Sequence, residues 1–243
     1  MRSWMESESP IRCDWITDLR SGLFTFQFNK SYMPRPHKLF YRRNLPHWQP
    51  PETTFFISYR LAGSLPVQIV TEMKEDYWKE KNKFENRSPL IQEKLREEYF
   101  YLFDKALDNN VNEPYWLKED TTALVIWDSL FFNNNIQYTL WAGCIMPNHV
   151  HLLLSTLKNS PPLDVILQNH KKFTAVHCNK LLKRSGQFWQ AESYDRIIRN
   201  RQHFNSTIDY ILENPVNAGL INDWKNWKWT YLHPQLTIGF NTT

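Results

Sequence analysis

The sequence is poor in cysteine and glycine, and each scarcity excludes a class of protein. Its 243 residues contain 3 Cys, all at isolated positions without a CxxC spacing. This argues against a disulfide framework and against a thiolate zinc site, and it favours a reducing compartment. With 6 Gly and no low-complexity tract, the composition is typical of a globular chain and not of a fibrous or disordered one.

Long apolar runs are also missing from the sequence. A membrane-spanning helix needs about 20 consecutive apolar residues, and no stretch approaches that length. The first residues carry Glu6, Glu8 and Asp14 in place of an apolar leader. We therefore expect a cytoplasmic protein without a membrane partner, associated with the nucleoid if it is bacterial.

Aromatic side chains and local charge are plentiful. Aromatic residues make up 15% of the chain, which suits either a dense core or stacking on unpaired bases. The net charge is +4, but it is unevenly spread: residues 72–120 carry a net charge of −4 and residues 168–201 a net charge of +6. A polyanionic partner would lie against the basic segment.

The stretch around His149 and His151 is the first candidate site. Side chains two residues apart in a strand point to the same side, so both imidazoles would leave one face while Val150 enters the core behind them. Paired imidazoles on a stiff backbone can form two arms of a divalent-metal site. An ordinary pair of strand histidines is the alternative.

The second candidate site is Tyr210 with Asn214, about sixty residues downstream. Residues four apart on a helix share a face, so the two side chains would emerge together. Asn offers a carbonyl oxygen to a hard metal ion, and Tyr offers a phenolic nucleophile. Taken alone, Tyr210 would more often be a core residue, and Asn214 before a proline would more often end a helix.

The apolar patterns predict an α+β fold. We expect strands at 53–61, 138–146, 149–155 and within 188–198, with a tight turn at 147–148. Helices are expected over 120–132, 162–182 and 207–213, and residues 67–110 are charged and helical in pattern. The order predicts an antiparallel sheet with helices on one face.

Four motifs, taken together and in order, identify a family resemblance. They are Pro147-Asn148-His149-Val150-His151, Phe188-Trp189-Gln190, Tyr194-Asp195-Arg196-Ile197-Ile198-Arg199 and Tyr210-Ile211-x-x-Asn214-Pro215-Val216-x-Ala218-Gly219-Leu220. The chain thereby resembles the single-tyrosine HUH transposases, in the branch associated with repetitive extragenic palindromes. The resemblance covers roughly residues 35–66 and 114–232. Residues 1–33 and 72–112 have no counterpart and are additions of unknown purpose.

The resemblance implies a ferredoxin-like fold, Mg²⁺ or Mn²⁺ as cofactor, and single-stranded DNA with palindromic hairpins as partner. Tyr210 would be the nucleophile, leaving a 5′-phosphotyrosine and a free 3′-hydroxyl, with Tyr194 as the nearest competitor. His149 and His151 would hold the metal with Asn214 as third ligand, and Glu213 ranks second for that place. Whether the protein is a monomer or a homodimer stays open.

The expected layout is an N-terminal extension and basic Pro-rich arm over residues 1–52, a catalytic domain over 53–232 with a helical insertion at about 72–112, and a tail over 233–243. DNA phosphates are expected on the basic helix and bases on the arm. The helix residues are Lys171, Lys172, Lys180, Lys183 and Arg184, and the arm residues are Arg42, Arg43, His47 and Trp48.

Two other functions fit the same sequence. A DNA-hairpin-binding regulator derived from such a transposase could keep the site without using it. A metal-dependent phosphoesterase could use the same histidines, but it would not need the basic helix, the aromatic arm or a tyrosine beside the metal. Formation of a covalent adduct with single-stranded DNA separates the three.

Overall fold

The computed structural model describes residues 40–42, 46–83, 88–109 and 114–237. The expected N-terminal extension lies almost wholly outside these ranges, as does the end of the expected tail. Of the expected arm, two short strands are described, β1 (Phe40–Arg42) and β2 (Pro46–Trp48), which pair as an antiparallel ribbon. Among the described residues, no helix is both long enough and apolar enough to cross a membrane.

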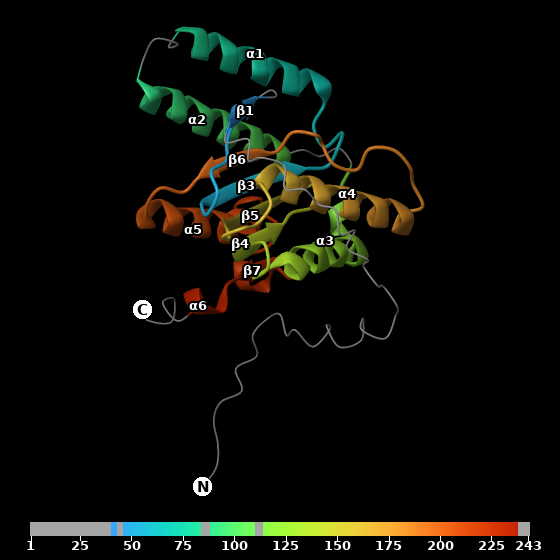
Figure 1. The fold of residues 1–243 in the computed structure, drawn as a ribbon. Coiled ribbons are helices and arrows are strands. Elements are labelled where there is room, and N and C mark those ends of the chain that lie inside the picture. The colour runs from blue at the N-terminus through green and yellow to red at the C-terminus, as the bar shows by residue number, and fades with distance from the viewer. Residues whose placement is uncertain (1–39, 43–45, 84–87, 110–113, 238–243) are drawn as a thin grey trace.

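A βαββαβ unit forms the centre of the fold (Figure 1). Its elements are β3 (Thr54–Arg60), α3 (Asp120–Asn133), β4 (Tyr138–Ile145), β5 (His149–Thr156), α4 (Leu163–Leu181) and β6 (Tyr194–Ile197). The sheet runs in the order β6-β3-β5-β4, with β7 (Thr230–Leu232) beyond β4, and every pairing is antiparallel. This is the ferredoxin-like arrangement, and the predicted α+β fold is confirmed.

Helices α3 and α4 cover one face of the sheet, as expected of this unit. Val150, Leu152 and Leu154 of β5 point into that layer and pack with apolar residues of both helices. The expectation of helices on one face does not hold for the whole chain, however. Phe56 and Leu153 on the opposite face are also buried, because two further helices cover them.

The helices on the opposite face are α5 (Arg201–Asn217) and α2 (Pro89–Asp108). Helix α5 is longer than expected, since Asn200 caps its start by accepting a hydrogen bond from the His203 N–H, and Pro215 lies inside the helix instead of ending it. Pro215 is near the C-terminal end, so the loss of its N–H affects only the last turn.

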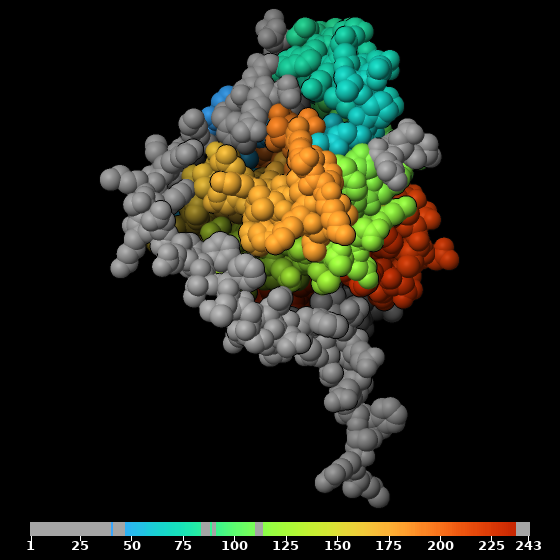
Figure 2. Space-filling model, turned by 90° about the vertical axis from the view of Figure 1, so that its right-hand side faces the viewer, coloured from blue at the N-terminus to red at the C-terminus, as the bar shows by residue number. Residues whose placement is uncertain are grey.

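Helices α1 (Val67–Lys83) and α2 occupy the segment in which the sequence predicted a helical insertion, at about residues 72–112. Helix α2 begins with a proline, which suits the first helical position. It lies between α1 and the sheet (Figure 1), and Phe100 of α2 packs on Phe56 at 5.3 Å and on Tyr194 at 4.2 Å between ring centroids. Figure 2 shows α1, in cyan and green, standing out from the body of the molecule. Helix α2 is thus part of the core, through Phe100.

The remaining elements are short. They are the 3₁₀ helices η3 (Trp116–Lys118) and η4 (Trp224–Asn226) and the helix α6 (Pro234–Thr237). The predicted turn at 147–148 joins β4 to β5, where the Met146 N–H donates to the His149 carbonyl at 2.9 Å. Because β5 is paired on both sides, the residues at its start have a rigid backbone.

Candidate metal and nucleophile site

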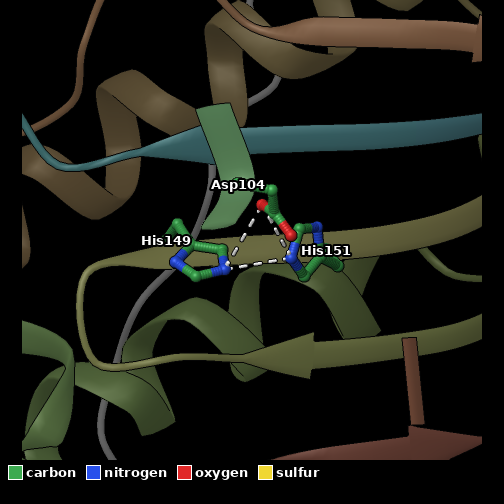
Figure 3. Close-up of side chains that lie close together, drawn as sticks. All are labelled: Asp104, His149 and His151. Carbon is green, nitrogen blue, oxygen red and sulfur yellow. Dashed lines mark hydrogen bonds and ion pairs between the residues drawn. The ribbon is translucent and has the colours of Figure 1, made fainter. Parts of the chain in front are cut away.

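His149 and His151 leave β5 on the face that carries α2 and α5, as the strand alternation predicts. Both side chains are fully buried, and their Nε2 atoms lie 2.9 Å apart (Figure 3). The His149 Nδ1–H donates to the Asn148 side-chain oxygen at 2.6 Å, and the Asn148 amide donates to the Leu107 carbonyl at 3.0 Å. This chain of bonds leaves the His149 Nε2 lone pair directed into the site.

Asp104 of α2 is the third member of the cluster, and the sequence analysis missed it. Its Oδ1 lies 3.3 Å from His151 Nε2 and 3.7 Å from His149 Nε2 (Figure 3). Asp108, one turn later, reaches 3.9 Å from His149 Nε2. The available signal was this pair of aspartates four residues apart on an otherwise apolar helix face, where a solvated carboxylate is unexpected.

Asn214 reaches the cluster from α5. Its side chain is buried, and its amide donates to Asp104 Oδ2 at 3.3 Å, so the predicted ligand contacts the carboxylate directly. Glu213, the competing ligand, is exposed on the other side of the helix. Helix geometry accounts for the difference, since three and four residues from Tyr210 are about 100° apart around the axis.

Tyr210 lies one turn before Asn214, and its hydroxyl donates to Asp104 Oδ2 at close range. Its ring packs edge-on against His151 at 5.6 Å between centroids. The predicted residues Tyr210, His149, His151 and Asn214 therefore meet at one place, with Asp104 between them. Tyr194, the competing nucleophile, is buried in β6 and stacks on Phe100 instead.

The pKa values in the site follow from burial and close charges. Burial, with His151 nearby, lowers the pKa of His149 to about 3, so its imidazole is neutral. Burial alone would raise the pKa of Asp104, but His151, His149 and the Tyr210 hydroxyl outweigh this and lower it to about 2. Burial and Asp104 raise the pKa of Asp108 to about 7 and hold the pKa of Tyr210 well above its usual range.

These side chains fit a divalent cation. Within the described ranges, Asp104 Oδ1 and Asn214 Oδ1 are buried without a hydrogen-bond partner, which is costly unless a ligand contacts them. Ligand atoms about 2.1 Å from one ion and at right angles to each other lie roughly 3 Å apart. The separations of 2.9 Å and 3.3 Å at His151 Nε2 match that spacing.

The basic helix does not lie beside this cluster. Helix α4 packs on the sheet face opposite the histidines, because the crossover from β5 passes behind the sheet. Lys171 donates to the Gln190 carbonyl at 2.9 Å, and the Arg184 guanidinium stacks on Trp116 at 3.7 Å. Both thus have internal contacts. The predicted phosphate contacts that are exposed are Lys172, Lys180 and Lys183.

The predicted base-reading residues of the arm also differ in their placement. Arg43 and the side chain of Arg42 lie outside the described residues. Trp48 is 53% exposed and free to stack on a base. His47 is buried, with Nδ1 bonded to Asp195 and Nε2 at 3.1 Å from Glu192, so a role in reading bases does not fit its placement. It joins the ribbon to β6 instead.

The contacts of His47 with Asp195 and Glu192, here called the His47 clamp, predict a stability that depends on pH. Burial alone would lower the pKa of His47, but Asp195 and Glu192 raise it to about 9. A histidine whose folded pKa exceeds its unfolded value of about 6.5 stabilises the fold below that pH and loses the contribution as pH rises through 9. The shift corresponds to about 3 kcal/mol in the free energy of unfolding.

Urea unfolding at pH 6 and pH 9.5 would measure this difference in wild type and in His47→Asn. We expect the wild type to lose more stability than the variant over this range. The same substitution at His177, whose ring packs on Phe173 away from carboxylates in the described chain, is the matched control. Equal pH dependence in wild type and His47→Asn would contradict the clamp.

Comparisons with known proteins complete the description of the site. No protein-family model matches the sequence. The chain is 27% identical over 101 residues to a Haemophilus influenzae protein provisionally named a REP-associated tyrosine transposase, an alignment that covers 38% of this chain and 57% of that protein. The chain therefore spans little more than half the length of this relative.

A solved structure, described as a REP-associated tyrosine transposase bound to a REP hairpin, covers 83% of this chain and 87% of its own. It is 16% identical with a TM-score of 0.49. The sequence match lies with the family that the four motifs indicate. The resemblance is confirmed: this chain is similar to a REP-associated tyrosine transposase.

Proposed function

We propose that this protein is a metal-dependent single-stranded DNA nuclease and strand transferase that cuts at or near palindromic hairpins through a 5′-phosphotyrosine intermediate. The observation that carries the proposal is the convergence of the Tyr210 hydroxyl on a carboxylate that also lies against His149 and His151. A tyrosine with only a packing role would not need a carboxylate and two histidines beside its hydroxyl. The similarity to a REP-associated tyrosine transposase supports the same reaction class.

Tyr210 would attack a backbone phosphorus of the bound strand. A bond forms between the phenolic oxygen and phosphorus while the bond from phosphorus to the 3′-oxygen breaks, which leaves a 5′-phosphotyrosine and a free 3′-hydroxyl. In net terms the phenolic proton passes to the departing 3′-oxygen. The phosphotyrosine keeps the energy of the broken bond, so a 3′-hydroxyl can reverse the reaction on a new strand without ATP.

Asp104 would serve this reaction mainly by position. Its Oδ2 already accepts the hydrogen bond of the Tyr210 hydroxyl and is the nearest acceptor for the phenolic proton. A carboxylate with a pKa of about 2 is a weak base, however, so it orients the phenol more than it deprotonates it. Burial and the nearby carboxylates raise the pKa of Tyr210, so the phenol is protonated before a strand or a metal ion binds.

We propose His149, His151 and Asp104 as the residues that hold the metal, with Asn214 Oδ1 as a further donor. This places Asp104 where the sequence analysis expected Asn214. When bound, Mg²⁺ or Mn²⁺ would counter the charge that develops on a nonbridging phosphate oxygen. The two oxygens of Asp104 then have separate partners, Oδ1 toward the histidines and Oδ2 toward Tyr210 and Asn214.

The test is a search for the covalent intermediate. Incubation with a 3′-labelled hairpin oligonucleotide and Mn²⁺ should give a labelled protein–DNA species that survives denaturing electrophoresis, because Tyr210 stays joined to the fragment on the 3′ side of the cut, and excess EDTA should prevent it. A hairpin-binding regulator would bind the same oligonucleotide without this species. A phosphoesterase would hydrolyse a small phosphodiester without it. Adduct formation that persists undiminished in EDTA would rule out metal dependence.

A further inference from the structure

A cavity adjoins the metal and nucleophile site on the side of the inserted helices. Its walls come from the end of β3, from α1 and α2, and from residues 190–194 ahead of and at the start of β6. Asp104 lies in its lining as well as in the metal cluster. Aromatic side chains dominate the walls contributed by the insertion, namely Tyr77, Trp78, Tyr99, Phe100 and Phe103.

The aromatic lining is preorganised by contacts among its own members. Tyr77 of α1 and Tyr99 of α2 have ring centroids 4.8 Å apart, and Tyr99 lies 5.9 Å from Phe103. Tyr77 is buried among these rings, whereas Trp78 and Tyr99 are partly exposed and can offer a ring face to a planar ligand without further ordering. A nucleobase is a planar ligand that suits them.

Arg60 brings a positive charge to the same cavity. It is 8% exposed, and within the described chain its guanidinium donates, from Nη1, to the Leu61 carbonyl at 3.3 Å and to Ser64 Oγ at 3.0 Å. Among described residues, no carboxylate oxygen lies within ion-pair distance of it. A buried guanidinium whose contacts within the described residues are two neutral oxygens and the Phe103 ring, at 5.2 Å, can receive an anionic ligand.

Lys74 of α1 is a second cation in the lining. The wall also holds the carboxylates of Glu192, which is paired with His47 at 3.1 Å, and of Asp104, which is engaged in the metal cluster. The charges available to a ligand are therefore those of Arg60 and Lys74. An aromatic cavity with two such cations matches a base together with its phosphate.

Building on the function proposed above, we propose that this cavity takes one unpaired nucleotide of the DNA strand next to the scissile phosphate. Its base would stack on Trp78 and Tyr99, which Tyr77 supports from behind, and its phosphate would contact Arg60. Because Asp104 borders both spaces, the seated nucleotide would set the distance between the hairpin and the cut. The inserted helices would then determine the cleavage position.

The experiment measures binding in EDTA, so cleavage does not contribute. A hairpin oligonucleotide with single-stranded flanks is prepared in versions that each replace one flanking nucleotide by an abasic residue, and affinity is measured by fluorescence anisotropy. We expect one flanking position to matter most for the wild type, with a loss of about tenfold when its base is removed. That loss should fall below about twofold in Trp78→Leu and in Tyr99→Leu.

Phe132→Leu is the matched control, because Phe132 is 55% exposed on α3, across the sheet from the cavity. This variant should show the same loss of affinity as the wild type when the base at the sensitive position is removed. Arg60→Lys and Lys74→Gln should weaken binding to intact and abasic strands alike, and circular dichroism establishes that each variant is folded.

Two outcomes would overturn the proposal: a wild type that is indifferent to every abasic replacement, or aromatic variants that retain the wild-type loss at the sensitive position. These outcomes are distinct from failure of the proposed reaction. A protein that forms no covalent adduct but shows the position-specific loss would keep the cavity assignment and lose the nuclease. A protein that forms the adduct without the position-specific loss would do the reverse.

Discussion

Tyr210→Phe is expected to abolish both strand cleavage and the covalent adduct while leaving hairpin affinity within about twofold of wild type. The substitution removes the attacking oxygen and keeps the ring, whose contacts with His151 and Phe56 hold this part of α5 in place. Loss of a nucleophile costs on the order of 10⁴-fold or more in rate. The measurement is adduct yield on denaturing gels beside affinity from anisotropy.

Stability should change little in Tyr210→Phe. Asp104 Oδ2 loses one hydrogen-bond donor but keeps the Asn214 amide at 3.3 Å, which limits the cost to about 1 kcal/mol. Tyr194→Phe is the companion variant, because Tyr194 is the competing nucleophile and stacks on Phe100 away from the cluster. We expect it to form the adduct. Undiminished cutting by Tyr210→Phe would show that the attacking group is elsewhere.

Asp104→Asn is the second substitution with a large expected effect. It keeps the shape of the side chain but removes the negative charge beside His149 and His151 and presents an amide to one of its neighbours. We expect Mn²⁺ affinity and cleavage to fall by at least about a hundredfold, since the loss of a charged ligand weakens both binding and phosphate neutralisation. Isothermal titration with Mn²⁺ measures the first effect without reference to activity.

Thermal unfolding gives an independent reading of the same site. A ligand that binds only the folded state raises the melting temperature, so Mn²⁺ should stabilise the wild type and leave Asp104→Asn unchanged. Asp108→Asn is the matched control one turn along the helix, because its carboxylate lies 3.9 Å from His149 and does not complete the cluster. If Asn214→Ala removes metal binding and Asp104→Asn does not, the ligand expected from the sequence is the correct one.

Local patterns in the sequence were sufficient for the parts of the site that depend on neighbouring residues. Alternation along β5 placed His149 and His151 on one face, and the helical repeat placed Tyr210 beside Asn214. The turn at 147–148 followed from its proline and asparagine. The order of strands and helices gave the sheet with α3 and α4 on one side. These features need only the geometry of a single strand or helix.

The features that the sequence did not predict depend on contacts between segments that are far apart in the chain. Asp104 and Asp108 on one helix face indicate a buried carboxylate, but nothing local says that α2 folds back across the sheet and brings Asp104 to the histidines of β5. The basic helix follows β5 directly in the sequence, but the crossover takes α4 to the other face of the sheet. His47 looked available for a base because its partners, Glu192 and Asp195, are far along the chain.

The hydrogen bond from the Asn148 amide to the Leu107 carbonyl joins the start of β5 to α2, the two elements that supply the metal cluster. Asn148 belongs to the Pro147-Asn148-His149-Val150-His151 motif, whereas Leu107 and Asp104 belong to α2. The same helix therefore supplies a carboxylate, anchors the residue that orients His149, and covers the hydroxyl of Tyr210. Direct hydrogen bonds therefore join α2 to the start of β5 and to α5 at this point. A shortened chain without α1 and α2 would not be a minimal version of this protein, because its histidines and tyrosine would face a different set of partners.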